Sequence, residues 1–217
     1  HYLRTPLARR RRETEMSVPD AEAREHMASD IAQVDGIIDK FLDYARPDHL
    51  ELHAVNLAEL VVACALPFTA REDMQVDLDI PAGVHVMADE VELSRVLSNL
   101  LENARRYGKT PGTEVTRVRV AAAAREQWVT LRVRDHGRGV PTEVLPNLTR
   151  PFFRGDSART SATGAGLGLA IVAEMVHNMG GSLELGNSAT GGLLALVTLR
   201  QAPASTPALG KKKRRGA

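Results

Sequence analysis

The sequence predicts an α+β protein in which a helical hairpin precedes one antiparallel-rich sheet covered by helices. Two observations support this prediction. Between residues 21 and 45, apolar side chains alternate at spacings of four and three, which is typical of a helix packed on other helices. After Pro47, strand-like stretches are mixed with three helical stretches in no regular βαβ order, which favours a layered α+β domain.

The predicted hairpin, residues 1–47, is expected to form the first domain. SVPDAE at 17–22 indicates a turn and a helix start, and Pro47 ends the second helix. A lone hairpin cannot bury its apolar faces, so we expect it to pair with a second copy in a four-helix homodimer. The apolar stripe of the second helix consists of Met27, Ile31, Val34, Ile38, Phe41 and Ala45.

The second domain is expected over residues 52–201, followed by a basic, flexible tail at 202–217 that has no periodic pattern. Its predicted helices cover 56–66, 89–108 and 166–180. Its predicted strands cover 75–80, 84–87, 115–123 and 128–135, with a closing hairpin of 182–186 and 191–200.

The composition argues against several classes of protein. A net charge of +1 gives no overall attraction to nucleic acid or membrane, and the basic runs lack interleaved aromatic residues. Cys64 is the only cysteine, which excludes an internal disulfide framework and favours a reducing compartment. No apolar run approaches the roughly 18 residues that a bilayer-spanning helix needs.

The predicted helix 89–108 carries polar residues suited to a nucleotide. Asn99 and Asn103 are four residues apart and share one face, with Arg106 and Tyr107 nearby. Amide oxygens suit a hard cation such as Mg²⁺, a guanidinium suits phosphate, and a phenol ring can stack on a base. By itself, the pattern is equally that of an amphipathic helix with two surface asparagines.

Two glycine-rich stretches follow. In DHGRGVP (135–141), Gly137 and Gly139 allow a sharp turn after a strand, and Asp135 at the strand end is able to accept from an exocyclic amine. GAGLGLAIV (164–172) runs into a helix whose N-terminus presents N–H groups to phosphate. It lacks the Lys-Ser/Thr pair of a P-loop. Taken alone, DHGRGVP is better explained as an ordinary Gly/Pro turn.

In this order, the motifs resemble those of the sensor histidine kinases of two-component signalling. The matching stretches are HYLRTPL at the start, the asparagine helix, DHGRG, PFFRGDSART (151–160) and GAGLGLAIV. RGDSART and FLDYARP are similar to the osmosensing branch, whose usual partner is a winged-helix response regulator. The resemblance covers residues 1 to about 200. It implies a dimerisation and phosphoacceptor domain, followed by the ATP-binding sandwich of gyrase-, chaperone- and kinase-type proteins.

The resemblance also implies roles for individual residues. His1 matches the phosphoacceptor, and Thr5 matches the threonine that helps water remove phosphate from the partner. Asn103 matches the Mg²⁺ ligand, Tyr107 the ring that stacks on adenine, and Asp135 the carboxylate that reads the adenine amino group. The residues matching other nucleotide contacts, pocket glycines and the lid are Asn99, Arg106, Gly137, Gly139, Arg154, Arg159, Gly164, Gly166, Leu167 and Gly168.

The implied activity is ATP-dependent autophosphorylation of His1 and transfer of the phosphoryl group to an aspartate of a response regulator. Neutral imidazole, with a free pKa of about 6.5, is a competent nucleophile at neutral pH. Phosphoryl transfer needs in-line positioning and charge neutralisation, which Mg²⁺ and arginines supply. The implied partners are a response regulator receiver domain and a second copy of the chain, not nucleic acid. The resemblance further implies a soluble, cytoplasmic portion of an inner-membrane protein, anchored only through a segment upstream of His1.

Two departures from the family pattern leave alternatives open. Tyr2 stands where the family has Glu or Asp, and a phenol with a pKa near 10 is no base at neutral pH, so slow autophosphorylation is predicted. Arg10 and Arg12 fall where the family places apolar core residues, so we expect them to snorkel outward or the first helix to fray. A nucleotide-binding scaffold that has lost catalysis is therefore one alternative. A chaperone- or topoisomerase-like ATPase is another, against which the HYLRTPL hairpin argues.

Overall fold

The computed structural model describes residues 50–153 and 166–203, together with Met27, Ile31, Val34 and Ile38. Those four positions are helical, as the apolar stripe predicts, and Met27 and Val34 are exposed. The rest of the predicted hairpin lies outside the described residues, as do residues 154–165 and the tail from 204. The hairpin, its pairing in a dimer and the domain limits therefore stay predictions.

A five-stranded sheet in the order β2-β4-β5-β7-β6 forms one layer of the second domain. β2 pairs with β4 in parallel, whereas the other three pairs of neighbouring strands are antiparallel. The predicted antiparallel-rich sheet is thus confirmed. Its strands are β2 (Met74–Asp79), β4 (Thr116–Arg125), β5 (Trp128–Asp135), β6 (Ser182–Asn187) and β7 (Leu193–Arg200).

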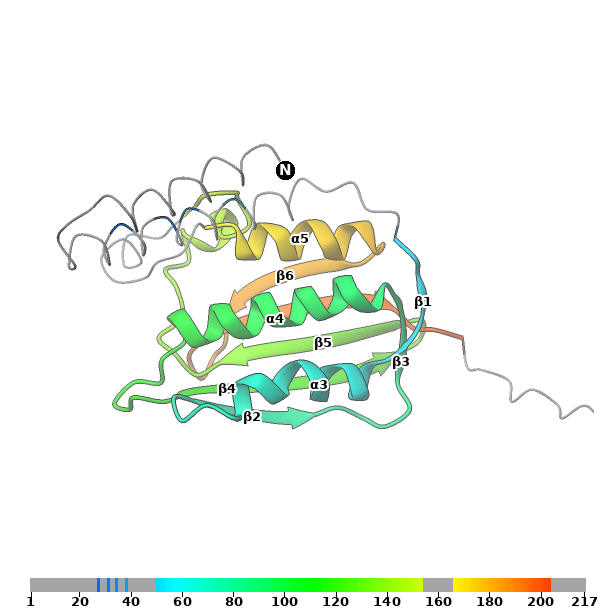
Figure 1. Cartoon of the computed structure of the whole chain (residues 1–217), viewed down its shortest axis with the longest axis horizontal. Coiled ribbons are helices and arrows are strands. Elements are labelled where there is room, and N and C mark those ends of the chain that lie inside the picture. The colour runs from blue at the N-terminus through cyan, green and yellow to red at the C-terminus, as the bar shows by residue number, and fades with distance from the viewer. Residues whose placement is uncertain are drawn as a thin grey trace, which may run out of the picture.

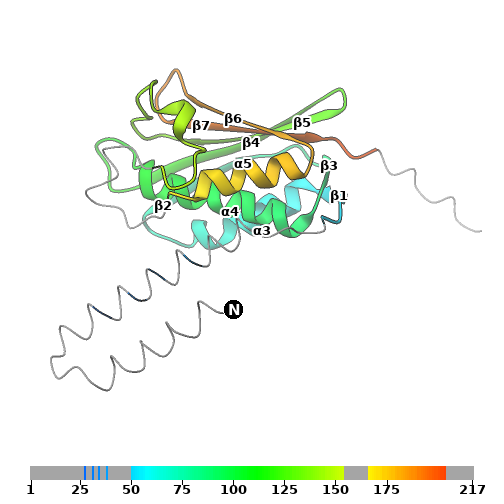
Figure 2. The same ribbon diagram turned by 90° about the horizontal axis from the view of Figure 1, so that it is seen from above.

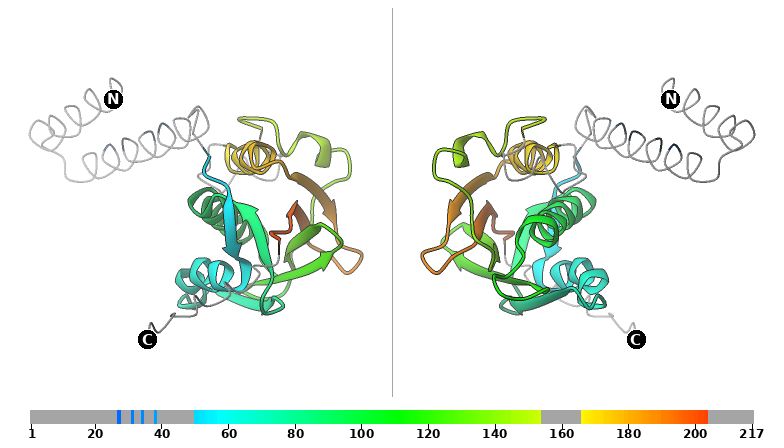
Figure 3. Two further views of the ribbon diagram at one scale, coloured as in Figure 1. Left: turned by 90° about the vertical axis from the view of Figure 1, so that its right-hand side faces the viewer. Right: turned by 90° about the vertical axis from the view of Figure 1, so that its left-hand side faces the viewer.

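Three helices form the second layer, over one face of this sheet. They are α3 (Leu57–Thr69), α4 (Glu90–Tyr107) and α5 (Gly168–Asn178), and they lie side by side with α4 in the middle (Figure 1). Seen from above, the helices and the sheet lie in two separate layers (Figure 2). The end-on views show all three helices on the same side of the strands (Figure 3). The predicted sheet covered by helices is therefore confirmed.

Two short elements were not predicted. β1 (His53–Asn56) pairs antiparallel with β3 (His85–Ala88) in a separate two-stranded sheet. Only one residue of β1, Val55, is buried, so the strand shows no alternation that a sequence pattern could reveal. A single turn of 3₁₀ helix, Leu145–Asn147, follows the glycine loop after β5.

The end of α3 differs from the prediction. The helix begins where expected, because the Asn56 side chain caps it by accepting from the N–H groups of Ala58 and Glu59 at 3.1 and 3.4 Å. It then continues past residue 66 through Pro67 to Thr69. Pro67 removes one backbone donor from the last turn of the helix, and Phe68 packs against the core.

The core lies between the two layers and includes the apolar face of α4. The predicted inner face of that helix is buried, with every member at most 3% exposed: Leu93, Val96, Leu97, Leu100 and Leu101. The sheet contributes Val118, Val120, Leu131 and Val197, each at most 2% exposed. Among the described residues, no helix combines the length and apolarity that a bilayer crossing requires.

Candidate nucleotide-binding site

The C-terminal end of α4 and the C-terminal end of β5 meet at a buried carboxylate. Asp135 is the last residue of β5 and is 6% exposed. Gly108, directly after α4, lies so close that a Cβ there would be 2.5 Å from the Asp135 Cβ. Gly192, with φ +88°, lies against the other side, where a Cβ would be 1.9 Å from the Asp135 carbonyl oxygen. Only glycine fits at either contact.

The carboxylate of Asp135 is held by backbone donors on one oxygen. The N–H groups of Gly137 and Leu193 donate to Oδ1 at 2.8 and 3.2 Å. In the described part of the chain, no protein donor bonds to Oδ2. Burial raises the pKa of the Asp135 carboxyl above its ordinary value, and the two N–H donors offset only part of that rise. The carboxylate thus offers one fixed and one available oxygen in a largely water-excluded position.

The glycine loop after β5 is clamped from a distant strand. Asn187, at the end of β6, accepts from the Val140 N–H at 3.0 Å and donates to the Val140 carbonyl oxygen at 2.6 Å. Gly139, with φ +71°, lies against the same side chain. The loop that follows Asp135 is therefore fixed at both of its ends.

The two asparagines of α4 have different environments. The Asn99 Nδ2 donates to the Arg95 carbonyl oxygen at 2.9 Å, one turn back along the helix. The Asn99 Oδ1 faces the start of α5, where a Cβ on Gly168 would be 3.6 Å away. Asn103, one turn further on, is partly buried, and its side chain makes no hydrogen bond within the described residues.

Charged residues at the end of α4 form a connected cluster. The Glu102 carboxylate accepts from Arg105 at 2.9 and 3.0 Å and from the Arg106 Nε at 2.7 Å. Hydrogen bonding to Arg105, and then to Arg106, lowers the pKa of Glu102 to about 2 despite its partial burial. Asp73, just before β2, contacts Arg105 at 3.4 Å. Next in sequence, Tyr107 is 45% exposed, as a ring available for stacking would be.

The two sides of the segment 154–165 are joined. The Phe152 N–H donates to the Gly166 carbonyl oxygen at 3.0 Å, and a Cβ on Gly166 would be 2.7 Å from the Phe153 carbonyl oxygen. Leu167 is 1% exposed, so its side chain belongs to the core. Within the described residues, the first turn of α5 has no side-chain cap, unlike those of α3 and α4. Uncapped N–H groups at a helix start suit an anion.

Five predicted site residues lie outside the described residues, namely His1, Thr5, Arg154, Arg159 and Gly164. The structure brings the others together in two groups. Asn99 lies beside Gly168 at the start of α5, and Asp135 bonds to Gly137 beside the end of α4. Sequence positions that are far apart therefore meet around the C-terminal half of α4.

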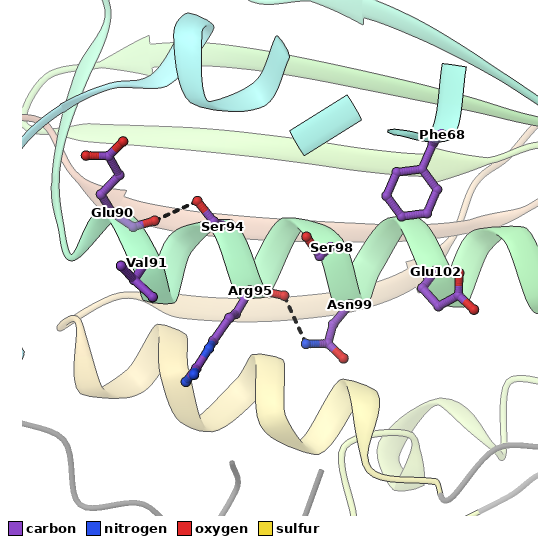
Figure 4. Close-up of a pocket in the computed structure, with 8 residues that line it drawn as sticks. All are labelled: Phe68, Glu90, Val91, Ser94, Arg95, Ser98, Asn99 and Glu102. Atoms are coloured by element: carbon purple, nitrogen blue, oxygen red, sulfur yellow. Dashed lines mark hydrogen bonds between the residues drawn. The ribbon is translucent and has the colours of Figure 1, made fainter. Parts of the chain in front are cut away.

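An open groove of about 680 Å³ runs along the side of α4 that faces away from the sheet (Figure 4). Glu90 and Val91 line one end, Asn99 and Glu102 line the other, and Phe68 projects toward it from α3. Asp135 and the glycine loop do not line this groove. Of the predicted site residues, Asn99 is therefore the one that lines this groove, and the groove is not the adenine pocket.

The residues present fit a Mg²⁺-bound nucleotide. The available Oδ2 of the buried Asp135 matches an exocyclic amine, and the Asn103 amide, which makes no hydrogen bond to the described residues, matches a hard cation. Within the described residues, no group of three or more His, Cys, Asp or Glu side chains is placed to hold a metal ion. Mg²⁺ is usually bound by one or two protein ligands together with substrate phosphates, so a single amide ligand is consistent with it.

Comparison with known proteins identifies the family. Residues 88–203, which span α4, the glycine loop, α5 and the last hairpin, match the family described as Histidine kinase-, DNA gyrase B-, and HSP90-like ATPase. The chain belongs to this family. It therefore carries an ATP-binding domain, and the sequence resemblance is confirmed at that level.

Relatives narrow the family to sensor histidine kinases. The chain is 33% identical over 187 residues to the signal transduction histidine-protein kinase AfsQ2 of Streptomyces coelicolor, covering 84% of this chain and 33% of AfsQ2. It is 27% identical to a solved mycobacterial sensor histidine kinase, MprB, with a TM-score of 0.61 over 70% of this chain and 99% of that one. The ATPase domain is thus the ATP-binding portion of a sensor histidine kinase, and the chain spans about a third of the length of AfsQ2.

A third likeness concerns the fold alone. Full-length ShkA, solved in complex with AMPPNP, has a TM-score of 0.74 at 24% identity, covering 94% of this chain and 45% of that one.

Sequence reasoning missed three residues of this kinase domain. Gly108 and Gly192 enclose Asp135, and Asn187 clamps the loop after it. Gly108 follows a clear helix pattern and was available as a cap signal. The roles of Gly192 and Asn187 depend on long-range strand pairing, for which a single sequence carries no signal.

Proposed function

We propose that this chain is a working part of an ATP-dependent histidine autokinase that phosphorylates His1 and passes the phosphoryl group to an aspartate of a response regulator. The main support for ATP binding in this proposal is the buried Asp135. Its Oδ1 is fixed by two backbone donors, and its Oδ2 is available. Such an acceptor suits the adenine amino group, because a buried acceptor without a partner is costly.

The proposed roles of the other residues follow from their positions. The amide of Asn103 would hold Mg²⁺, which neutralises charge on the phosphates. Arg106 would contact phosphate, and Tyr107 would stack on the base. Asn99 and the uncapped first turn of α5 would border the phosphates from the opposite side. The AMPPNP in the similarly folded ShkA supports a nucleotide in this type of site.

His1 supplies the nucleophile in this proposal. A neutral imidazole nitrogen forms a bond to the γ-phosphorus as the bond to the ADP oxygen breaks, and the ring releases one proton. Tyr2 cannot take that proton at neutral pH, so the rate is expected to be low. Thr5 is proposed to help water remove phosphate from the response regulator. The whole protein is proposed to act as a homodimer anchored in the membrane by a segment outside this chain.

The proposal is tested by incubating the chain with Mg²⁺ and ATP labelled with ³²P at the γ-position. Label that survives alkali, is lost in acid and is absent from His1→Gln and Asn103→Ala variants is expected. ATP binding is measured separately by titration calorimetry on each variant. Binding without label would indicate the scaffold alternative, and steady ATP turnover without label would indicate an ATPase.

A further inference from the structure

We propose that Glu102 is a positioning residue that orients the Arg106 guanidinium toward the nucleotide phosphates. This inference rests on the proposed function and assigns a role to a residue outside the family motif described above. The direct evidence is the short contact from the Arg106 Nε to the Glu102 Oε1, 2.7 Å, across one turn of α4.

Glu102 is itself held in one orientation. The Arg105 Nε donates to Oε2 at 2.9 Å and the Arg105 Nη2 donates to Oε1 at 3.0 Å, which is a two-point contact between planar groups. Arg105 is in turn tied to Asp73, outside the helix, at 3.4 Å. A surface glutamate normally samples several rotamers, but this one is fixed by a partner that is fixed at its far end. Glu102 is therefore a fixed hydrogen-bond acceptor that can hold Arg106 in one orientation.

The charges in this cluster are arranged to permit that role. A lone carboxylate close to bound phosphates would repel them. Glu102 meets two guanidinium groups, and Asp73 meets one of them, so both carboxylates of the four-residue cluster are neutralised at neutral pH. Arg105 is shared between Glu102 and Asp73, and Arg106 contacts Glu102. Because Glu102 contacts Arg106 through Nε, its contact does not compete for Nη1 and Nη2, through which we expect phosphate to be bound.

Holding Arg106 in place lowers the entropic cost of binding. An arginine side chain has several rotatable bonds, and ordering it during association weakens the affinity that its contacts provide. A carboxylate that restricts the guanidinium before the ligand arrives removes part of this cost. The benefit applies only to ligands that carry phosphate, because Arg106 would contact nothing else of the nucleotide.

The test compares ATP with adenosine, which lacks phosphates, on the full chain by titration calorimetry. Glu102→Ala is expected to weaken ATP binding about three- to tenfold while leaving adenosine affinity unchanged. Arg106→Ala is expected to weaken ATP binding at least as much. In the double variant, loss of Glu102 is expected to add nothing, because its effect passes through Arg106.

A matched control removes a carboxylate–arginine pair from a strand remote from the site. Asp79→Ala deletes the acceptor of an Arg119 hydrogen bond of 2.8 Å, and it is expected to leave both affinities unchanged. Three results would overturn the inference: unchanged ATP affinity in Glu102→Ala, equal losses for ATP and adenosine, or additive losses in the double variant. Failure of the unaltered chain to bind ATP would instead overturn the proposed function, and this inference with it.

Discussion

Replacing Asp135 with asparagine separates the role of this residue in binding from its role in folding. The change is nearly isosteric, and the two backbone donors decide the orientation of the new amide. The N–H groups of Gly137 and Leu193 face the Oδ1 position, so the amide oxygen occupies that position. The amide nitrogen is then forced into the Oδ2 position, where it presents a donor in place of an acceptor.

A large effect on ATP affinity and a small effect on stability are therefore expected. An adenine amino group would meet another donor, and losing that hydrogen bond costs about 1–3 kcal/mol, or roughly 5- to 150-fold in ATP affinity. Stability is expected to change by less than about 1 kcal/mol, because weaker hydrogen bonds to a neutral oxygen are offset by removal of a buried charge. Guanine carries an acceptor at the equivalent position, so the preference for ATP over GTP should narrow.

The pH dependence gives a second readout. The pKa of Asp135 is raised by burial, so the folded state holds its proton more tightly than the unfolded state does. An acid with a raised pKa costs stability when ionised, and this cost disappears as the pH falls through the folded pKa. The unaltered protein should therefore gain stability relative to Asp135→Asn on acidification from neutral pH.

Titration calorimetry with ATP and GTP measures the affinity and the nucleotide preference. Urea unfolding at several pH values measures the stability and its pH dependence. Adenosine serves as a control ligand, since its affinity should fall as much as that of ATP. ATP affinity within twofold of the unaltered protein would refute the reasoning, because Asp135 would then be a structural residue only. A loss of stability of several kcal/mol would show that the amide does not adopt the assigned orientation.

Three further predictions concern the supports of the site. Gly192→Ala should cost about 3 kcal/mol or more in urea unfolding, since its Cβ would meet the Asp135 carbonyl oxygen at φ +88°. Asn187→Ala should cost about 1–2 kcal/mol and speed hydrogen exchange at the Val140 N–H, because both hydrogen bonds of the clamp are lost. Glu102, whose pKa is lowered from 4.5 to about 2, should contribute stability at neutral pH that is lost as the pH falls from 4.5 toward 2. Because this carboxylate is partly exposed, the contribution should be about 1 kcal/mol, measured as the difference from Glu102→Gln.

Each of these three predictions has an outcome that would contradict it, and the glycine prediction also has a matched control. Gly191 has φ +91°, but a Cβ there would be 3.4 Å from its nearest neighbour, so Gly191→Ala isolates the strain from the clash. Equal losses for both glycines would contradict the close approach. Unchanged exchange at Val140 would show that Asn187 does not clamp the loop. A Glu102→Gln variant whose stability falls in parallel with the unaltered protein below pH 4.5 would contradict the lowered pKa.

Local signals in the sequence were sufficient for the elements that carry the site. α4 begins after Asp89, whose side chain accepts from the N–H groups of Val91 and Glu92, and it ends before Gly108. The predicted range 89–108 was accurate because caps and an apolar face act within a few residues. β5 matches its predicted bounds and ends at Asp135, as expected. Where local rules compete with packing, as at Pro67 within α3, the prediction failed.

The sequence by itself determined which chemical groups are present and their order along the chain: two asparagines on one helix face, a carboxylate before a glycine turn, and glycines before a helix. The tertiary structure decided which of them meet. Leu193 donates to a carboxylate 58 positions earlier, and Asn187 clamps a loop 47 positions earlier. Both contacts follow from the antiparallel register of β5, β7 and β6. That register is selected by burial of a shared core, a long-range free energy that no local pattern contains.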